Sequence, residues 1–438
     1  MKKLIDYINN NVLVKVTSLQ TASLLTKIIA GILTSKAIAV FIGPVGLAII
    51  GNLRNFVSGF QTIATLGFYN GFVKYISDFK DDVVALSKVV SSVFYVGFIA
   101  TLLVSFFCYF NSEFINDIIF PSYNDYAYII RIFAIVLPFY ALNMFSFSIM
   151  NGFSKYKILI IINIIGQILS MSVALLLIYQ NKLDGALISV VIAESLIFLI
   201  TLVGIINRRS LVPLIQANNI DFNFLKKLSS YSLMALFTAV LLPFAAIAIR
   251  MYIIENVSYK DAGFWEAITR VSKYYLMLVS SLMALYILPR FSEIDSIKEF
   301  RKEVFNFYKT VIPVLAVGLI VIYLLRSFIV SAIFTNEFKP VEDLFLWQLL
   351  GDFVKVLSTV IAYQFLAKKM FWHYILTEAF LIIILYSTSV YFIDLFDSVK
   401  GAVIAHFVSY VMYYGIILLI FGSSLFGVLE VDKKNNSV

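Results

Sequence analysis

Long apolar stretches recur along this sequence from one end of the chain to the other. About 20 predominantly apolar residues in a helix span the hydrocarbon core of a bilayer. Hydrophobic residues make up 61% of the chain and charged residues only 14%, against about 25% charged residues in soluble domains. The sequence therefore predicts an all-α integral membrane protein. Twelve transmembrane helices are predicted, at residues 16–42, 46–74, 84–110, 124–150, 156–179, 184–206, 225–250, 261–288, 304–330, 341–366, 371–394 and 399–426.

Basic residues alternate between the two sides of this predicted arrangement. Both terminal segments and every even-to-odd connection carry two or more Lys or Arg residues, whereas the other connections carry only Lys182, Lys260, Lys339 and Lys400. Lys and Arg are enriched in cytoplasmic loops. The pattern predicts that both termini are cytoplasmic, and a miscounted helix would have broken the alternation.

The longest predicted cytoplasmic connection divides the helices into two groups of six. Because six is even, both groups begin on the same side of the membrane and would form a parallel repeat. Gly46 is followed by Arg54 in the second predicted helix, and Gly263 by Arg270 in the eighth, which supports this repeat weakly. The predicted N-terminal lobe, cytoplasmic linker, C-terminal lobe and polar tail comprise residues 1–206, 207–224, 225–430 and 431–438.

Polar stripes carry cations into the first two predicted helices. Polar residues recur at 3- and 4-residue steps around Lys27 in one helix and around Arg54 in the other, and neither stripe contains an acid. A charge at the centre of a membrane helix costs about 2.5–3.5 kcal/mol on insertion scales, so such residues usually face a cavity or a partner. We expect these two helices to line an aqueous, positively charged cavity.

The eighth and tenth predicted helices carry similar stripes that also contain acids. Glu266 and Arg270 form an i,i+4 pair in the favoured order, which is equally a self-compensating structural pair. Lys273 adds a cation beside them. We expect Glu266 to limit the field of Arg270, so that Glu266→Gln is better tolerated than Arg270→Gln. In the tenth helix, Asp352 is spaced to pair with Lys355.

These four stripes together hold five cations and two acids, which leaves an excess of three positive charges. Two unit charges 4 Å apart interact by about 4 kcal/mol at an effective dielectric constant of 20, so such a cavity favours an anion such as pyrophosphate. Arg131 lies about two turns into the fourth helix and is assigned to the cavity. For Arg250, as for Lys36 and Arg326, snorkelling from a helix end is an equal alternative. The candidate substrate-binding residues are Lys27, Arg54, Arg131, Arg250, Arg270, Lys273 and Lys355.

Two further acids lie in predicted membrane helices without an obvious partner in the sequence. Glu194 and Glu378 are either neutral core residues or ion-coupling sites, and the two interpretations remain open. With Glu266 and Asp352 they form the candidate coupling or charge-balancing group.

The sequence contains no motif of a soluble enzyme, such as a P-loop, HExxH or GxSxG. The predicted exterior loops are too short for the catalytic loop of a membrane glycosyltransferase or polymerase. The single cysteine, Cys108, excludes an intramolecular disulfide and a cysteine-based metal site. His373 and His406 lie in separate helices and are interpreted as packing residues. The sequence predicts no catalytic activity and no binding of a metal, a cofactor or nucleic acid.

Four short motifs resemble the Wzx-type flippases of O-antigen and enterobacterial common antigen, within the multidrug/oligosaccharidyl-lipid/polysaccharide exporter superfamily. The resemblance covers nearly the whole chain, and Trp-Gln-x-x-Gly-Asp-x-x-Lys is its most specific part. The motifs are Gly43-Pro44-Val45-Gly46-Leu47, Tyr69-Asn70-Gly71 with Lys74-Tyr75, Ala262-Gly263-Phe264-Trp265-Glu266, and Phe345-Leu346-Trp347-Gln348-Leu349-Leu350-Gly351-Asp352 with Lys355-Val356.

This resemblance implies two six-helix lobes around a central cavity that opens alternately to the two sides. It implies translocation of an undecaprenyl-pyrophosphate-linked oligosaccharide from the inner to the outer leaflet of the bacterial cytoplasmic membrane, for lipopolysaccharide or related glycan synthesis. A glycan polymerase of the same pathway is then a possible partner. Arg54, Arg250, Asp352 and Lys355 match family positions, whereas Lys273 stands where a relative has an acid. The alternative is an ion-coupled small-molecule exporter of the same fold, which an anionic cavity would favour.

Overall fold

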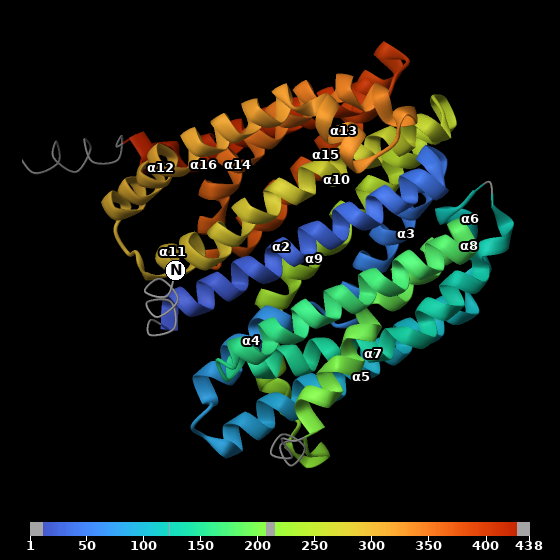
Figure 1. The fold of residues 1–438 in the computed structure, drawn as a ribbon. Coiled ribbons are helices and arrows are strands. Elements are labelled where there is room, and N and C mark those ends of the chain that lie inside the picture. The colour runs from blue at the N-terminus through green and yellow to red at the C-terminus, as the bar shows by residue number, and fades with distance from the viewer. Residues whose placement is uncertain (1–11, 122, 207–214, 427–438) are drawn as a thin grey trace, which may run out of the picture. The chain divides into compact units, whose positions relative to one another are not determined.

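The computed structural model describes residues 12–121, 123–206 and 215–426, and these residues form helices and turns without a β-strand (Figure 1). The predicted polar tail, 431–438, and residues 207–214 of the predicted linker lie outside the described residues. The first helices are α2 (Val12–Phe41), α3 (Gly43–Ala64), α4 (Tyr69–Phe79), α5 (Val83–Phe110), α6 (Ser112–Ile119), η1 (Asn124–Tyr126), α7 (Ala127–Gly152), α8 (Tyr156–Ile206) and η3 (Ala217–Asn219). They are followed by α9 (Phe222–Asn256), α10 (Tyr259–Leu282), η4 (Met283–Ile287), α11 (Leu288–Glu293), α12 (Ile297–Leu324), α13 (Arg326–Ile333), η5 (Asn336–Leu344), α14 (Phe345–Ala367), α15 (Phe371–Phe396) and α16 (Lys400–Phe426).

Ten helical stretches in the described residues are long and apolar enough to cross a membrane. The chain is therefore a multi-pass membrane protein. One stretch, Tyr156–Gly204, contains 49 residues, about twice the length that one crossing requires. Its backbone leaves the helical conformation at Lys182, with φ 45° and ψ −116°, so α8 consists of two helices. This break lies between the predicted spans 156–179 and 184–206.

The prediction of one continuous helix over 46–74 is wrong. Helix α3 ends at Ala64 and α4 begins at Tyr69, and both Leu66 and Gly67 have positive φ between them. A Cβ atom on Gly67 would lie 2.9 Å from the carbonyl oxygen of Ser232, so a glycine lets the chain bend against the backbone of α9. Polar residues lower the hydropathy of α3, which is not among the ten apolar stretches.

Two pairs of helices have matching lengths in the two parts of the sequence. Helices α5 and α12 both contain 28 residues, and the helices that follow them, α6 and α13, both contain 8. Each helix of the second pair begins and ends 214 residues after its counterpart in the first pair. Helix α5 spans 83–110 and α12 spans 297–324, whereas α6 spans 112–119 and α13 spans 326–333. The predicted helix 304–330 is accordingly two helices, interrupted at Leu325.

The chain forms two compact units, which we call the N-terminal unit (Met1–Ile247) and the C-terminal unit (Ala248–Val438). Their boundary lies inside α9, because the first part of α9 packs within the N-terminal unit. Phe224 and Leu228 of α9 join a core cluster with Phe72 of α4 and Phe145 of α7. The lobe boundary predicted at 207–224 overlaps the first residues of α9 and stays a prediction.

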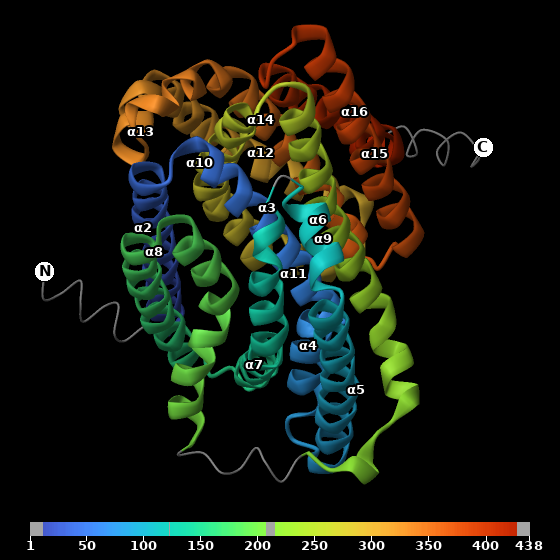
Figure 2. The same cartoon turned by 90° about the vertical axis from the view of Figure 1, so that its right-hand side faces the viewer.

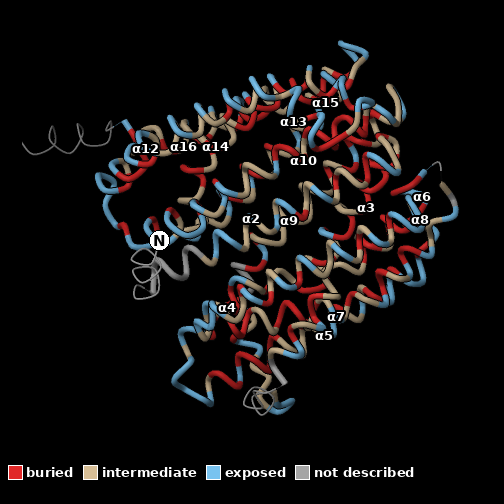
Figure 3. The backbone as a smooth tube through the Cα atoms, viewed as in Figure 1, coloured by how far each residue is buried: buried red, intermediate tan, exposed pale blue. Residues whose placement is uncertain are grey.

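Packing within the units follows the apolar faces of the helices. In the N-terminal unit α4, α5 and α7 lie side by side, as Figure 2 shows. In the C-terminal unit α16 packs against both α14 and α15. Figure 3 shows that most helices combine buried residues on one side with exposed residues on another. Because many of the exposed residues are large and apolar, these outer faces suit contact with lipid.

Candidate functional site

The C-terminal unit contains a buried ion cluster formed by two arginines and one acid. Arg250 Nη2 donates to Glu266 Oε2 at 2.5 Å, and Arg270 Nε donates to Glu266 Oε1 at 2.8 Å. All three residues are only 2% exposed. The guanidinium of Arg250 also lies 5.2 Å from the ring centre of Trp265. We call Arg250, Glu266 and Arg270 the arginine–glutamate cluster, and its formal charge is +1.

The turn between α9 and α10 positions this cluster. Helix α9 ends at Asn256, and Ser258 caps α10 by accepting a hydrogen bond from the backbone N–H of Asp261 at 3.1 Å. Because this turn is short, the start of α10 lies beside the end of α9, and Arg250 therefore lies opposite Glu266. Glu266 and Arg270 are one turn apart on α10, as the sequence predicts, but the contribution of Arg250 requires the α9–α10 turn.

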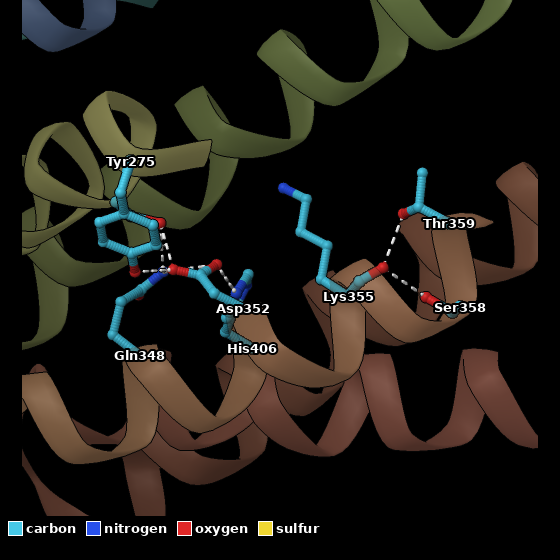
Figure 4. A network of polar contacts seen from close by, with 8 residues as sticks. Tyr275, Gln348, Asp352, Lys355, Ser358, Thr359 and His406 are labelled. Carbon is cyan, nitrogen blue, oxygen red and sulfur yellow. Dashed lines mark hydrogen bonds and ion pairs between the residues drawn. The ribbon is translucent and has the colours of Figure 1, made fainter. Parts of the chain in front are cut away.

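A second buried cluster forms around Asp352, which is 1% exposed (Figure 4). Ser272 and Tyr275 of α10 both donate to Asp352 Oδ2. His406 Nε2 of α16 lies 3.0 Å from Oδ1, and Gln348 Nε2 of α14 lies 3.3 Å from Oδ2. We call these five residues the Asp352 cluster. Because its members come from three helices, the carboxylate holds α10, α14 and α16 together.

The interpretation that Asp352 pairs with Lys355 is wrong. Lys355 lies on the next turn of α14, and no hydrogen bond or ion pair joins its amino group to the Asp352 carboxylate in Figure 4. Its Nζ atom lies 5.3 Å from the ring centre of Tyr410 on α16. Within the part of the chain that the structure describes, no carboxylate forms an ion pair with Lys355. The amino group of Lys355 is therefore not held in a direct ion pair with Asp352.

His406 was not selected from the sequence, because a single histidine in an apolar helix is usually a packing residue. The signal that could have identified it is the glycine before Asp352. A Cβ atom on Gly351 would lie 2.3 Å from His406 Cδ2, so glycine is needed where α16 approaches α14. That close approach brings the imidazole within reach of the Asp352 carboxylate.

The remaining candidate acids have different surroundings. Glu378 on α15 is buried and accepts a hydrogen bond from the Tyr413 hydroxyl at 3.0 Å, so it has a partner that the sequence does not reveal. Glu194 on α8 is half-buried and forms no hydrogen bond or ion pair with another described residue. Their predicted role in ion coupling stays a prediction.

The other candidate cations lie outside the two clusters. Lys27 on α2 and Lys273 on α10 are exposed, and Arg54 on α3 is half-buried. Arg131 at the start of α7 donates to Glu113 Oε1 at 3.1 Å and to Ser112 Oγ at 2.9 Å. The structure therefore joins Arg250 with Arg270, and it places Arg131 in an exposed ion pair. In the described residues, no group of three or more His, Cys, Asp or Glu side chains is arranged to hold a metal ion.

Comparison with known proteins relates most of this chain to one family. The sequence profile of a family described as "Polysaccharide biosynthesis protein" matches residues 37–343. The chain is 29% identical over 407 residues to the lipid III flippase of Escherichia coli (strain K12), covering 92% of this chain and 97% of that protein. The lipid III flippase of Shigella flexneri gives the same values.

Solved structures share the fold at much lower sequence identity. An inward-facing multidrug resistance MATE family transporter of the MOP superfamily aligns with a TM-score of 0.71 and 13% identity, covering 92% of this chain and 95% of that one. The lipid II flippase MurJ, in an inward closed conformation, aligns with a TM-score of 0.66 and 17% identity, covering 93% and 87%. The chain thus has the fold of these transporters.

Proposed function

Because this chain belongs to the polysaccharide biosynthesis protein family, we propose that it translocates an undecaprenyl-pyrophosphate-linked oligosaccharide across the bacterial cytoplasmic membrane. The glycan would pass from the inner to the outer leaflet and then to a polymerase of the same pathway. The observation that carries this proposal is the end-to-end similarity to two lipid III flippases. These two relatives are flippases by name, so we assign no catalytic step to this chain.

We propose twelve membrane crossings in two six-helix lobes around a central cavity. This count includes α3 and both parts of α8 in addition to the other nine apolar stretches. The matching lengths of α5–α6 and α12–α13 support two parallel six-helix repeats. The lobes would open the cavity alternately to each side, while the polyprenyl chain of the substrate stays in lipid.

Within this cavity we assign the pyrophosphate to Lys355 of the C-terminal unit and to the polar stripes of Lys27 and Arg54 in the N-terminal unit. Lys355 is the main candidate in the C-terminal unit because no described carboxylate forms an ion pair with it. Lys27 and Arg54 are the candidates in the N-terminal unit, where their polar stripes contain no acid. Arg250 and Arg270, which are ion-paired with Glu266, would contribute to the electrostatic field near the anion without binding it directly. Arg131 would contribute least to anion binding because Glu113 already neutralises its charge.

A small-molecule exporter of the same fold is not favoured by these comparisons. The inward-facing multidrug transporter shares the fold at only 13% identity, whereas the lipid III flippase of Escherichia coli is 29% identical to this chain. A cavity with an excess of positive charge would also repel cationic drugs.

The proposed function predicts slower translocation when both N-terminal cations are removed. In liposomes that contain the purified protein and a fluorescent lipid-pyrophosphate oligosaccharide, the Lys27→Ala, Arg54→Ala variant should be about tenfold slower or more. Such a loss corresponds to one charge-assisted contact of about 1.5–3 kcal/mol. Arg54→Lys should restore the rate only in part, because an ammonium lacks the planar fork for phosphate oxygens.

Lys182→Ala is the matched control for this experiment, because Lys182 is exposed in the break of α8. It should translocate at the wild-type rate. A wild-type rate in the double variant would remove these cations from the anion site. The absence of translocation by the wild-type protein would instead contradict the proposed function.

The orientation predicted from the loop charges can be measured separately. In a Cys108→Ser background, a membrane-impermeant thiol reagent applied from outside should label Ser122→Cys and leave Ser210→Cys unlabelled. Ser122 and Ser210 both lie outside the described residues, so their labelling rests on the loop charges alone. Labelling only at position 210 would reverse the orientation and place both termini outside the cytoplasm.

A further inference from the structure

An apolar groove of about 290 Å³ lies between α12 and α14 of the C-terminal unit. Its accessible surface is entirely apolar. Both helices contribute exposed side chains to it, including Ile320 at 58% and Leu346 at 43% exposed. A groove of this chemistry on a membrane helix suits a hydrocarbon chain better than water. The residues of α12 that line it are Ala316, Leu319, Ile320 and Tyr323.

A groove of about 260 Å³ lies at the equivalent place in the N-terminal unit, between α5 and α7. Its α5 lining includes Leu102, Ser105, Phe106 and Tyr109, each of which precedes one of the four α12 residues by 214 positions. The same shift relates the bounds of α5 and α12. The groove is therefore a repeated feature of the helix pair, and the two copies have a tyrosine at the same register.

A cation lies at this tyrosine end of the C-terminal groove. Arg326, the first residue of α13, lies 4.5 Å from the ring centre of Tyr323 and donates to the Tyr323 carbonyl at 3.1 Å. Ser327 beside it donates to Glu342. Among the described residues, no carboxylate forms an ion pair with Arg326. Its charge therefore lies at the end of α12, and basic residues at the ends of membrane-spanning helices reach the lipid headgroups.

The N-terminal groove has a cation at the same end, but an acid neutralises it. The position equivalent to Arg326 is Ser112, and Ser112 Oγ accepts a hydrogen bond from Arg131 Nε at 2.9 Å. Arg131 also forms an ion pair with Glu113 at 3.1 Å. The lining residues of α5 and α12 thus have the same register in the two grooves. The cation at the tyrosine end is paired with an acid in the N-terminal groove but not in the C-terminal groove.

We propose that the C-terminal groove is a binding site for an anionic phospholipid of the surrounding bilayer. One acyl chain occupies the groove, and the phosphate binds the guanidinium of Arg326. Because a similar groove occurs in each unit, a lipid present all around the protein fits the pair better than a substrate transported singly. The N-terminal groove holds an acyl chain without preference for an anionic headgroup, since Glu113 already pairs with Arg131.

Native mass spectrometry of the full-length protein tests this site. The protein is titrated with phosphatidylglycerol and, separately, with phosphatidylcholine, and the affinity of the tightest bound lipid is measured. Arg326→Ala should weaken phosphatidylglycerol binding about fivefold, the usual effect of one basic residue near anionic lipid, and leave phosphatidylcholine binding unchanged. Arg326→Gln, which keeps the length of the side chain, provides the same comparison if Arg326→Ala does not fold.

Groove-filling substitutions separate this site from non-specific lipid binding. Ala316→Phe places a ring in the C-terminal groove and should abolish the preference for phosphatidylglycerol. Leu102→Phe enlarges the equivalent residue of the N-terminal groove and should preserve that preference. The proposal is overturned if Arg326→Ala and Arg326→Gln bind phosphatidylglycerol like wild type, or if Ala316→Phe retains the preference. It is also overturned if Ala316→Phe loses the binding of undecaprenyl phosphate but keeps the binding of phosphatidylglycerol.

Discussion

Glu266→Gln is expected to destabilise the C-terminal unit by about 3–5 kcal/mol, the usual cost of breaking a buried ion pair by removing one partner. Two buried guanidiniums, those of Arg250 and Arg270, would lose the carboxylate that both contact. A glutamine can accept a hydrogen bond but cannot offset the two positive charges. The midpoint of thermal unfolding of the purified protein in detergent should fall, together with the yield of folded protein.

The comparison with Arg270→Gln decides whether this explanation is correct. That variant keeps the pair between Arg250 and Glu266 and should lose less stability than Glu266→Gln. Glu255→Gln is the matched control, because Glu255 is exposed at the end of α9, and it should unfold like wild type. Equal midpoints for Glu266→Gln and Arg270→Gln would show that the two arginines do not depend on one shared acid.

This expected order is the reverse of the order predicted from the sequence. The sequence pairs Glu266 with Arg270 and places Lys273 beside them, and this pairing predicts that loss of the acid is the milder change. The structure adds Arg250 as a second buried cation on the same carboxylate. With two cations and one acid, removal of the acid leaves the larger uncompensated charge.

Asp352→Ala is expected to abolish most translocation and to lower the stability of the C-terminal unit by about 3 kcal/mol or more. The change leaves the donors of Ser272, Tyr275 and Gln348, and the ring of His406, without their shared acceptor. Each buried polar group that loses its partner costs about 1–3 kcal/mol. Unfolding midpoints in detergent measure the stability, and the liposome assay measures transport.

Asp343→Ala is the matched control for this second prediction, because Asp343 is exposed on η5 nine positions earlier. Its stability should remain within about 0.5 kcal/mol of wild type. Asp352→Asn keeps one acceptor oxygen and should be intermediate in stability between Asp352→Ala and wild type. Wild-type stability in Asp352→Ala would mean that the donors find other acceptors, and α10, α14 and α16 would not depend on this carboxylate.

The sequence by itself determined the membrane class, most helix positions and the family. Apolar runs of about 20 residues identify membrane helices because a lipid environment permits few other conformations of the backbone. The predicted helices 84–110, 371–394 and 399–426 agree closely with α5, α15 and α16. The break in α8 also lies where the apolar pattern is interrupted.

Only the tertiary structure decided where helices bend and which charges meet. The turn after α3 depends on a backbone contact between Gly67 and Ser232, which are distant in sequence. A helical pattern shows which residues share a face of one helix, and it correctly paired Glu266 with Arg270. It cannot show which side chains a neighbouring helix presents to that face. Arg250 and His406 therefore became visible as partners only when α9 and α16 were packed against their neighbours.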